Sequence, residues 1–203
     1  GEAIPGCPIL RTIMNPTIQL RSGAYFNFTK PETTPLSISD IAWGLSRICR
    51  YTGHCDGGPD DHIYSVLQHT LLVMDLVGGD REIQLEAALH DAAEAVLGDV
   101  SKPLKMLLPD YQAIEARVER AVRVQYGLPA EPHRNMELLI KYFDAVALKV
   151  EKRCLMPVGS DDSEWEWNWL RSYHDPGTVV VPRHAEGVRN EFLSRLELLG
   201  VRA

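Results

Sequence analysis

The chain has 203 residues, of which 45% are apolar and 24% charged, and its formal net charge is −7 at pH 7. This composition is typical of one globular domain with a sizeable core, and it excludes collagen-like and low-complexity classes. The acidic balance argues against duplex nucleic-acid binding. The sequence contains neither the ~18-residue apolar run of a membrane span nor a secretory signal pattern. We therefore expect a cytoplasmic protein that is not inserted in a membrane.

The N-terminal part of the chain differs in pattern from the rest. We expect residues 1–36 to form an irregular extension, because five prolines interrupt them. A helical core is expected over 37–155. Its first helix can be capped by Ser39 or Asp40 and runs through Ile48.

Two more helices are expected in the first half of the core. Asp60 or Asp61 can cap the second, which ends at the glycine pair 78–79. A third helix is expected over 81–97, because apolar residues recur there at helical spacing and Gly98 follows as a stop.

The remaining elements are also helical in pattern. A short helical turn is expected from Ser101-Lys102-Pro103, because proline is favoured just inside a helix start. Longer helices are expected over 110–126, 135–154 and 184–199. The tail, 156–203, adds an extended segment at 179–181 and three tryptophans that we expect to pack on the core, Trp165, Trp167 and Trp169. With strand signals nearly absent and no dividing linker, the predicted fold is all-α in one domain.

The third predicted helix has an unusual polar face. On a helical wheel His90, Asp91 and Glu94 project opposite the apolar stripe. A solvated face is the ordinary interpretation, but 85–97 contains no Lys or Arg and is rich in Ala, which suits a helix packed on both sides. Partly buried imidazole and carboxylate groups need partners, and a divalent metal is one such partner.

Two further polar residues interrupt apolar helix faces. Asp144 lies between Ile140 and Leu148, and it is either paired with Lys141 or directed inward at a cation. His69 lies on the flank of the second helix, where a buried core histidine is the simpler interpretation. Each signal is weak alone.

Together these residues resemble a known pattern. His69, His90-Asp91 and Asp144, each on a predicted helix, resemble the H…HD…D pattern of HD-domain phosphohydrolases, with a likeness that covers 37–155. A second His-Asp pair, His174-Asp175, serves as a control, because a Pro-Gly turn follows it and it has no helical context.

Two segments resemble particular branches of the HD-domain superfamily. The segment 90–105 is similar to the bacterial 5′-deoxynucleotidase branch, and 46–51 resembles phage-associated HD enzymes that act on deoxynucleotides. The resemblance implies that one divalent metal is bound by His69, His90, Asp91 and Asp144. Relatives often have Glu before the first metal histidine, whereas this chain has Gln68.

The resemblance also implies roles around the metal. Glu94 and Asp99 would be catalytic, and Arg47 would contact the phosphate, with Arg50 as the second candidate. Lys102 or Lys105 could add positive charge for the transition state. Imidazole and carboxylate ligands suit Mn²⁺, Co²⁺, Fe²⁺, Zn²⁺, Ni²⁺ or Mg²⁺ without choosing among them, and such an ion lowers the pKa of a bound water.

The expected function is therefore hydrolysis of a small nucleotide, first of all a (deoxy)nucleoside 5′-monophosphate. A phage-type dNTP triphosphohydrolase stays open, as does a non-catalytic HD module that binds a nucleotide or a partner protein. A purely structural metal is disfavoured, because such sites usually use cysteine. Pairing into a homodimer through an apolar face is left open.

Overall fold

The computed structural model describes residues 15–157 and 172–202. The predicted all-α class is confirmed, since the only strands in these two ranges form a small antiparallel hairpin of β1 (Thr17–Gln19) and β2 (Tyr25–Asn27). Trp165, Trp167 and Trp169 lie outside the described residues.

The helices follow one another with short connections. Their bounds are α1 Ile38–Leu45, α2 Val66–Val77, α3 Arg81–Leu89, α4 Glu94–Leu97, α5 Lys102–Lys105, α6 Pro109–Gln125, α7 Arg134–Leu155 and α9 Ala185–Leu198. Short 3-10 turns are η1 Pro31–Thr33, η2 Arg50–Gly53 and η3 Pro59–Asp61. No helix within this described part is long and apolar enough to cross a membrane.

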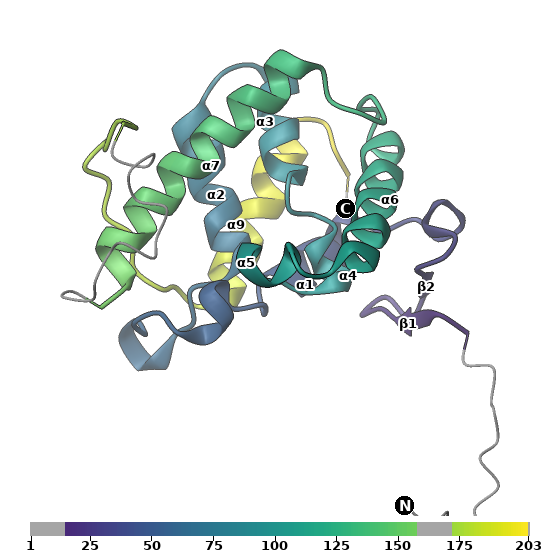
Figure 1. Ribbon diagram of the computed structural model, residues 1–203, viewed down its shortest axis with the longest axis horizontal. Coiled ribbons are helices and arrows are strands. Elements are labelled where there is room, and N and C mark those ends of the chain that lie inside the picture. The colour runs from purple at the N-terminus through teal and green to yellow at the C-terminus, as the bar shows by residue number, and fades with distance from the viewer. Residues whose placement is uncertain (1–14, 158–171, 203) are drawn as a thin grey trace, which may run out of the picture.

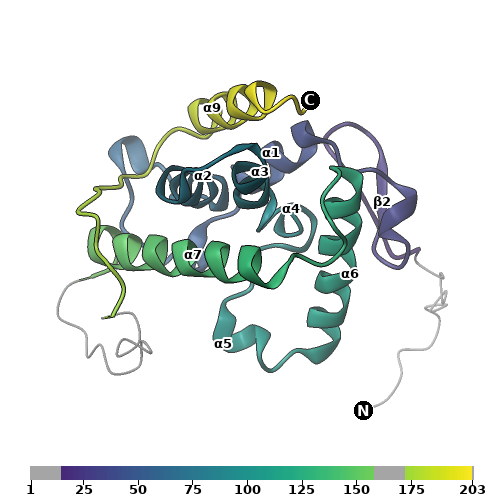
Figure 2. The same cartoon turned by 90° about the horizontal axis from the view of Figure 1, so that it is seen from above.

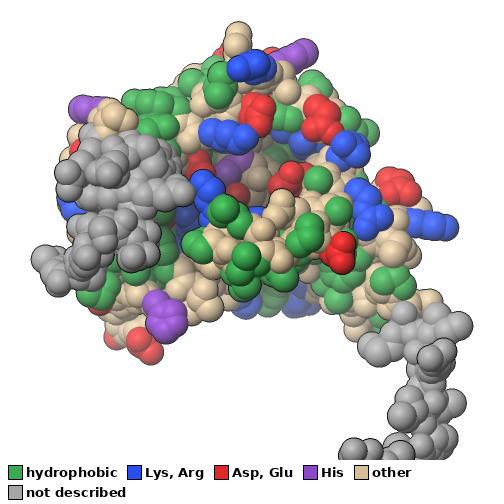
Figure 3. Space-filling model, in the orientation of Figure 1, with side chains coloured by type: hydrophobic (Ala, Val, Ile, Leu, Met, Phe, Trp, Pro, Cys, Tyr) green, Lys and Arg blue, Asp and Glu red, His purple; other side chains and the backbone are tan. Residues whose placement is uncertain are grey.

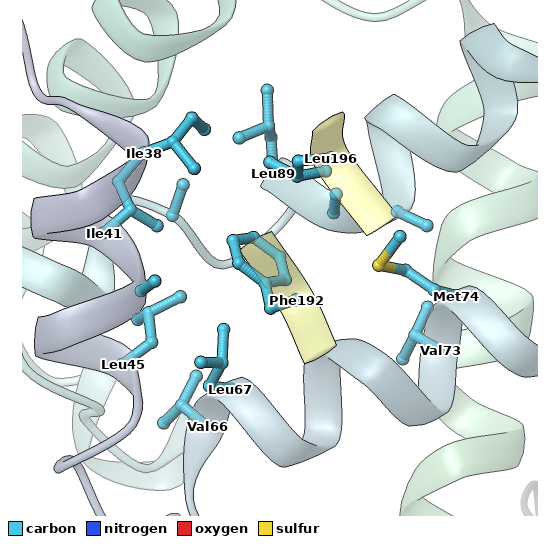
Figure 4. Packing of buried hydrophobic residues seen from close by; sticks show 14 of the residues in the cluster. Ile38, Ile41, Leu45, Val66, Leu67, Val73, Met74, Leu89, Phe192 and Leu196 are labelled. Atoms are coloured by element: carbon cyan, nitrogen blue, oxygen red, sulfur yellow. The ribbon is translucent and has the colours of Figure 1, made fainter. Parts of the chain in front are cut away.

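The helices stack in three layers. Figure 2 shows α9 on one side, α1, α2 and α3 in the middle, and α7 on the other side, while Figure 1 shows α7 crossing α2 along much of its length. Phe192 of α9 is fully buried at the centre of the apolar cluster in Figure 4, between side chains of α1 and α2. The middle layer is therefore covered on both faces, which explains the apolar sequence of α2.

The predicted caps of the first two helices are wrong. Ser37, rather than Ser39 or Asp40, caps α1, because its hydroxyl accepts from the Asp40 amide at 3.0 Å. Ser65 caps α2 in the same way, through the Gln68 amide at 3.2 Å.

The aspartates expected to cap α2 adopt a different conformation. Asp60 and Asp61 have φ of 54° and 59°, and this left-handed backbone belongs to the turn η3 and not to the start of a helix.

The third predicted helix is interrupted where its polar residues lie. It divides into α3 and α4, and the turn between them uses tight bonds from the Ala92 amide to the Leu89 carbonyl (3.1 Å) and from the Glu94 amide to the Asp91 carbonyl (3.0 Å). With about three residues per turn, Asp91 and Glu94 come to the same side of the backbone. The expected stop is confirmed, because Gly98 ends α4 with φ of 80°.

Candidate active site

The polar residues of three helices meet between the middle layer and α7. His69 comes from α2, His90 and Asp91 from the turn after α3, and Asp144 from α7. The Nε2 atoms of His69 and His90 are 3.3 Å apart, Asp144 Oδ1 lies 3.2 Å from the first, and Asp91 Oδ2 lies 3.2 Å from the second. We call these four residues the His69 cluster. The structure thus brings together all four residues expected to bind a metal.

Hydrogen bonds outside the cluster orient both imidazole rings. His90 Nδ1 is 2.7 Å from the Ala87 carbonyl oxygen, and His69 Nδ1 is 2.6 Å from a Glu151 carboxylate oxygen. Both partners are acceptors, so both Nδ1 atoms donate. Each Nε2 atom therefore points into the cluster, where it offers a lone pair to a cation when the ring is neutral and carries a proton when the ring is charged.

Four converging acceptors fit a divalent ion. Ligand atoms that lie about 2.1 Å from one ion are separated by roughly 3.0–3.4 Å between adjacent positions, which matches the distances of 3.2 and 3.3 Å in the cluster. His69, His90 and Asp144 alone offer three ligand atoms within 4.8 Å of one another. These buried and half-buried residues can hold a metal ion.

The electrostatics of the cluster favour a cation. Burial by itself lowers the pKa of His69, as does Arg50, but Glu151 and Asp144 outweigh both and raise it to about 10. Burial alone would raise the pKa of Asp91, yet His90 and His69 hold it well below its usual range. Without a metal, protons on the imidazoles supply the positive charge that these carboxylates attract.

Glu151 of α7 is the residue that the sequence analysis missed. It is fully buried and accepts bonds from His69, from the Tyr51 hydroxyl at 2.7 Å, from the Tyr64 hydroxyl at 3.0 Å and from Arg50 at 3.3 Å. Although burial opposes ionisation, His69 and Arg50 lower its pKa to about 2. Glu151 thus holds His69 in the orientation that a metal ligand needs.

A sequence signal for Glu151 does exist. It lies seven residues after Asp144 in the same helix, and a spacing of seven places two side chains on the same helical face.

Gln68, which stands where relatives often have Glu, binds the C-terminal tail. Its side chain donates to the Val181 carbonyl at 2.6 Å and accepts from the Arg183 amide at 3.1 Å, which fastens the tail to α2.

The two residues expected to be catalytic lie beside the cluster. Glu94 is buried, and its Oε2 atom has no hydrogen-bond partner within the described residues. Burial first, then the charges of Asp91 and Asp99, raise the pKa of Glu94 to about 9. Burial also raises the pKa of Asp99, while Arg50 opposes that shift. In the metal-free protein these shifts favour the protonated form of Glu94 at neutral pH.

The two arginines expected near the phosphate are separated. Arg50 lies at the site, with Nη1 4.0 Å from Asp99 and Nη2 3.3 Å from Glu151, and its buried Nε is unpartnered within 15–157 and 172–202. Arg47 is exposed, and its guanidinium lies 3.6 Å from the centre of the Trp43 ring. The structure thus places Arg50, and not Arg47, in contact with the site residues.

The two lysines are on α5, at the edge of the site. Lys105 binds Glu115 at 2.6 Å, and its charge lowers the pKa of Glu94 and Asp99 against their burial. Lys102 is exposed on the same short helix. Figure 3 shows a hollow between α7 and α5, with acidic, basic and histidine side chains inside it and hydrophobic side chains along the α5 edge. Exposed apolar residues of that helix and the next turn are Leu104, Met106, Leu107 and Leu108.

The control pair behaves as expected. His174 and Asp175 lie outside the helices, and Asp175 forms an ion pair with Arg153 at 3.0 Å. A His-Asp dipeptide is therefore not enough to form this site. The pair that forms it, His90-Asp91, lies directly after α3.

Comparison with known proteins identifies relatives over nearly the whole length. No model of a known protein family matches the chain. It is 37% identical over 188 residues to the protein named Uncharacterized protein YfdR of Escherichia coli (strain K12), an alignment that covers 90% of this chain and 96% of the relative. It is also 34% identical over 191 residues to Uncharacterized protein RCAP_rcc00048 of Rhodobacter capsulatus, covering 89% of this chain and 94% of that one. The chain belongs to the family that includes YfdR and RCAP_rcc00048.

Proposed function

We propose that this protein is a metal-dependent phosphohydrolase of the HD-domain type that dephosphorylates (deoxy)nucleoside 5′-monophosphates. The observation that carries the proposal is the convergence of two Nε2 lone pairs and two carboxylates in the His69 cluster, next to a protonated Glu94 and a partly unpaired Arg50. The reaction is attack of water on phosphorus with cleavage of the bond to the 5′ oxygen, giving inorganic phosphate and a nucleoside.

The His69 cluster would hold one divalent ion from the group Mn²⁺, Co²⁺, Fe²⁺, Zn²⁺, Ni²⁺ and Mg²⁺. Such an ion, when bound, lowers the pKa of water and offsets phosphate charge. The contribution of the protein is orientation, since Glu151 and the Ala87 carbonyl fix the two rings before any ion arrives.

Arg50 is the phosphate-binding residue of this proposal. Its Nη2 donates to Glu151 and its Nη1 lies 4.0 Å from Asp99, whereas the buried Nε–H has no hydrogen-bond partner within the described residues. A guanidinium edge matches two phosphate oxygens. Lys105 at the edge of the hollow adds a second positive charge.

Glu94 exchanges the protons of the reaction. The attacking water loses one proton and the leaving 5′ oxygen gains one, so a group that holds a proton at neutral pH is needed beside phosphorus. Burial and the neighbouring carboxylates give Glu94 that property. Asp99 lies 4.0 Å from Arg50 and would orient the Arg50 guanidinium and the Glu94 carboxyl group.

The decisive experiment compares the two His-Asp pairs of this chain. Phosphate release from nucleoside mono-, di- and triphosphates would be measured with metal-stripped protein after each ion is added back. His90→Ala should abolish metal-dependent release, because one ligand is lost, whereas His174→Ala should match the wild type. Glu94→Gln should still bind metal and lose about 10²–10⁴ in rate.

The products distinguish the remaining functions. Inorganic phosphate from monophosphates supports the proposal, whereas tripolyphosphate from dNTPs would replace it with the triphosphohydrolase. Metal-loaded protein that binds nucleotides and hydrolyses none of them would overturn the enzyme in favour of a non-catalytic binding module.

A further inference from the structure

Three arginines from separate elements surround one indole ring. The guanidinium carbons of Arg21, Arg47 and Arg189 lie 4.8, 3.6 and 4.6 Å from the centre of the Trp43 ring. Arg21 follows β1, Arg47 follows α1, and Arg189 belongs to α9. Because all three lie within 4.8 Å of one point, no two guanidinium carbons are further apart than twice that distance. We call Arg21, Arg47 and Arg189 the Trp43 arginine cluster.

No carboxylate neutralises this cluster among the described residues. The polar contacts of Arg47 and Arg189 are with the hydroxyl of Ser46, at 3.4 and 3.3 Å, and none of the three arginines forms an ion pair there. The acid one turn earlier on α1, Asp40, is already bound by Ser37 at 2.8 Å and by the Ser22 amide at 2.9 Å. Three positive charges are thus gathered without a negative partner from 15–157 or 172–202.

Like charges at this separation are expected to repel one another. Burial lowers the pKa of Arg47, and the charges of Arg189 and Arg21 lower it further. Stacking on Trp43 holds a guanidinium in place while leaving its edge N–H groups free to donate. An anion with several oxygens would remove the repulsion and use these donors.

We propose that the Trp43 arginine cluster is a binding site for oligophosphate groups, distinct from the metal site. Three guanidinium forks require a ligand with several negative charges and oxygens spread along its length, as a chain of phosphoryl groups has and a single carboxylate has not. Because Arg47 covers the Trp43 ring, the indole holds an arginine rather than a base. The cluster would therefore bind the phosphate groups of the ligand, whether these are free or part of a nucleotide.

The cluster and the proposed active site belong to different parts of the fold. Trp43 and Arg189 are carried by α1 and α9, and Figure 2 shows α9 on the opposite side of the molecule from α5 and α7, with α1 between them. The charges that shift the pKa of Arg47 are those of Arg189 and Arg21. The charges that raise the pKa of Arg50 include those of Glu151, Asp91 and Asp144. Binding at the two sites can therefore be measured separately.

The test is calorimetric titration of the full chain with inorganic tripolyphosphate. It uses the His90→Ala background as well as the wild type, so that binding at the metal site does not contribute. Binding should persist in His90→Ala and weaken about tenfold or more when Arg21→Ala or Arg189→Ala is added, because each removes charge-assisted hydrogen bonds. Arg134→Ala, which removes an exposed arginine from the start of α7, is the matched control and should leave the affinity unchanged.

Either of two results would overturn the site. One is tripolyphosphate binding that Arg21→Ala and Arg189→Ala leave unchanged, and the other is binding that His90→Ala alone abolishes. Using one variant from the hairpin and one from α9 guards against a local folding defect in either. A parallel titration with ATP identifies the source of the ligand: equal affinity indicates the oligophosphate itself, and affinity tenfold tighter indicates a nucleotide. If the cluster binds and the enzyme panel is silent, this inference stands while the proposed function fails.

Discussion

The His69 cluster and the Trp43 arginine cluster treat charge in opposite ways. In the first, imidazoles and carboxylates pair around the fully buried His69, and Glu151 behind it accepts from four donors. In the second, three positive groups share one ring near the surface without an acid among the described residues. Unpaired charge is expensive in the interior and cheap in water, so the fold supplies partners only to the inner cluster. Substitutions in the inner cluster should therefore change stability, and those in the outer one should change binding alone.

A large loss of stability at any pH is expected from Glu151→Ala. The substitution leaves Arg50 and His69 buried without their counter-charge, so the free energy of unfolding should fall by about 3–5 kcal/mol. Metal affinity should weaken about 10–100-fold, because His69 loses the bond that orients it. Urea unfolding and metal titration measure both, with the exposed Glu197→Ala as control. Equal stability of the two variants would show that the inner charges are not paired as described.

Glu94→Gln should stabilise the metal-free protein in a pH-dependent manner. The folded state keeps a proton on Glu94 up to about pH 9, whereas the unfolded chain loses it near 4.5. Between these values the wild type should lose about 1.4 kcal/mol of stability per pH unit through this group as the pH rises. Glutamine cannot ionise, so the variant should gain on the wild type with rising pH. Unfolding curves at pH 5, 7 and 8.5 test this, and parallel curves for both proteins would contradict it.

Gly44 tests the contact between α1, which carries Trp43, and α4, which carries Glu94. It follows Trp43 in α1, and a Cβ at this position would lie 2.7 Å from the Ala95 carbonyl oxygen, next to Glu94. Gly44→Ala should therefore push α1 from α4 and reduce the free energy of unfolding by about 1–3 kcal/mol. Gly187→Ala in α9, where a Cβ meets nothing within 4 Å, is the matched control and should raise it by about 0.5–1 kcal/mol. Thermal unfolding compares them, and a stable Gly44→Ala would mean that the two helices can separate freely.

The smallest effect is expected from Arg189→Ala without ligand. This arginine has no acidic partner among the described residues, so its loss should change the free energy of unfolding by less than about 0.5 kcal/mol. Urea unfolding beside Glu151→Ala makes the comparison direct. A large destabilisation would show that the outer cluster is structural and would remove the contrast between the two clusters.

Much of the fold can be predicted from local patterns in the sequence. The helices expected over 110–126, 135–154 and 184–199 agree with α6, α7 and α9 to within two residues, because each has a long apolar stripe and Pro or Gly near one end. The capping residues of α1 and α2 were harder to predict from the sequence. Several serines and aspartates near each start can cap a helix, and the path of the preceding loop selects among them.

The sequence by itself determined the helical class of this protein, because helix periodicity is a local property. It also supplied the four residues that meet in the His69 cluster, through their resemblance to the H…HD…D pattern. Only the tertiary structure decided that Arg50 reaches the site while Arg47 stacks on Trp43, and that Glu151 holds His69. The physical reason is that such contacts join different layers. They depend on how each helix is rotated and where each loop runs, which packing of the whole core sets.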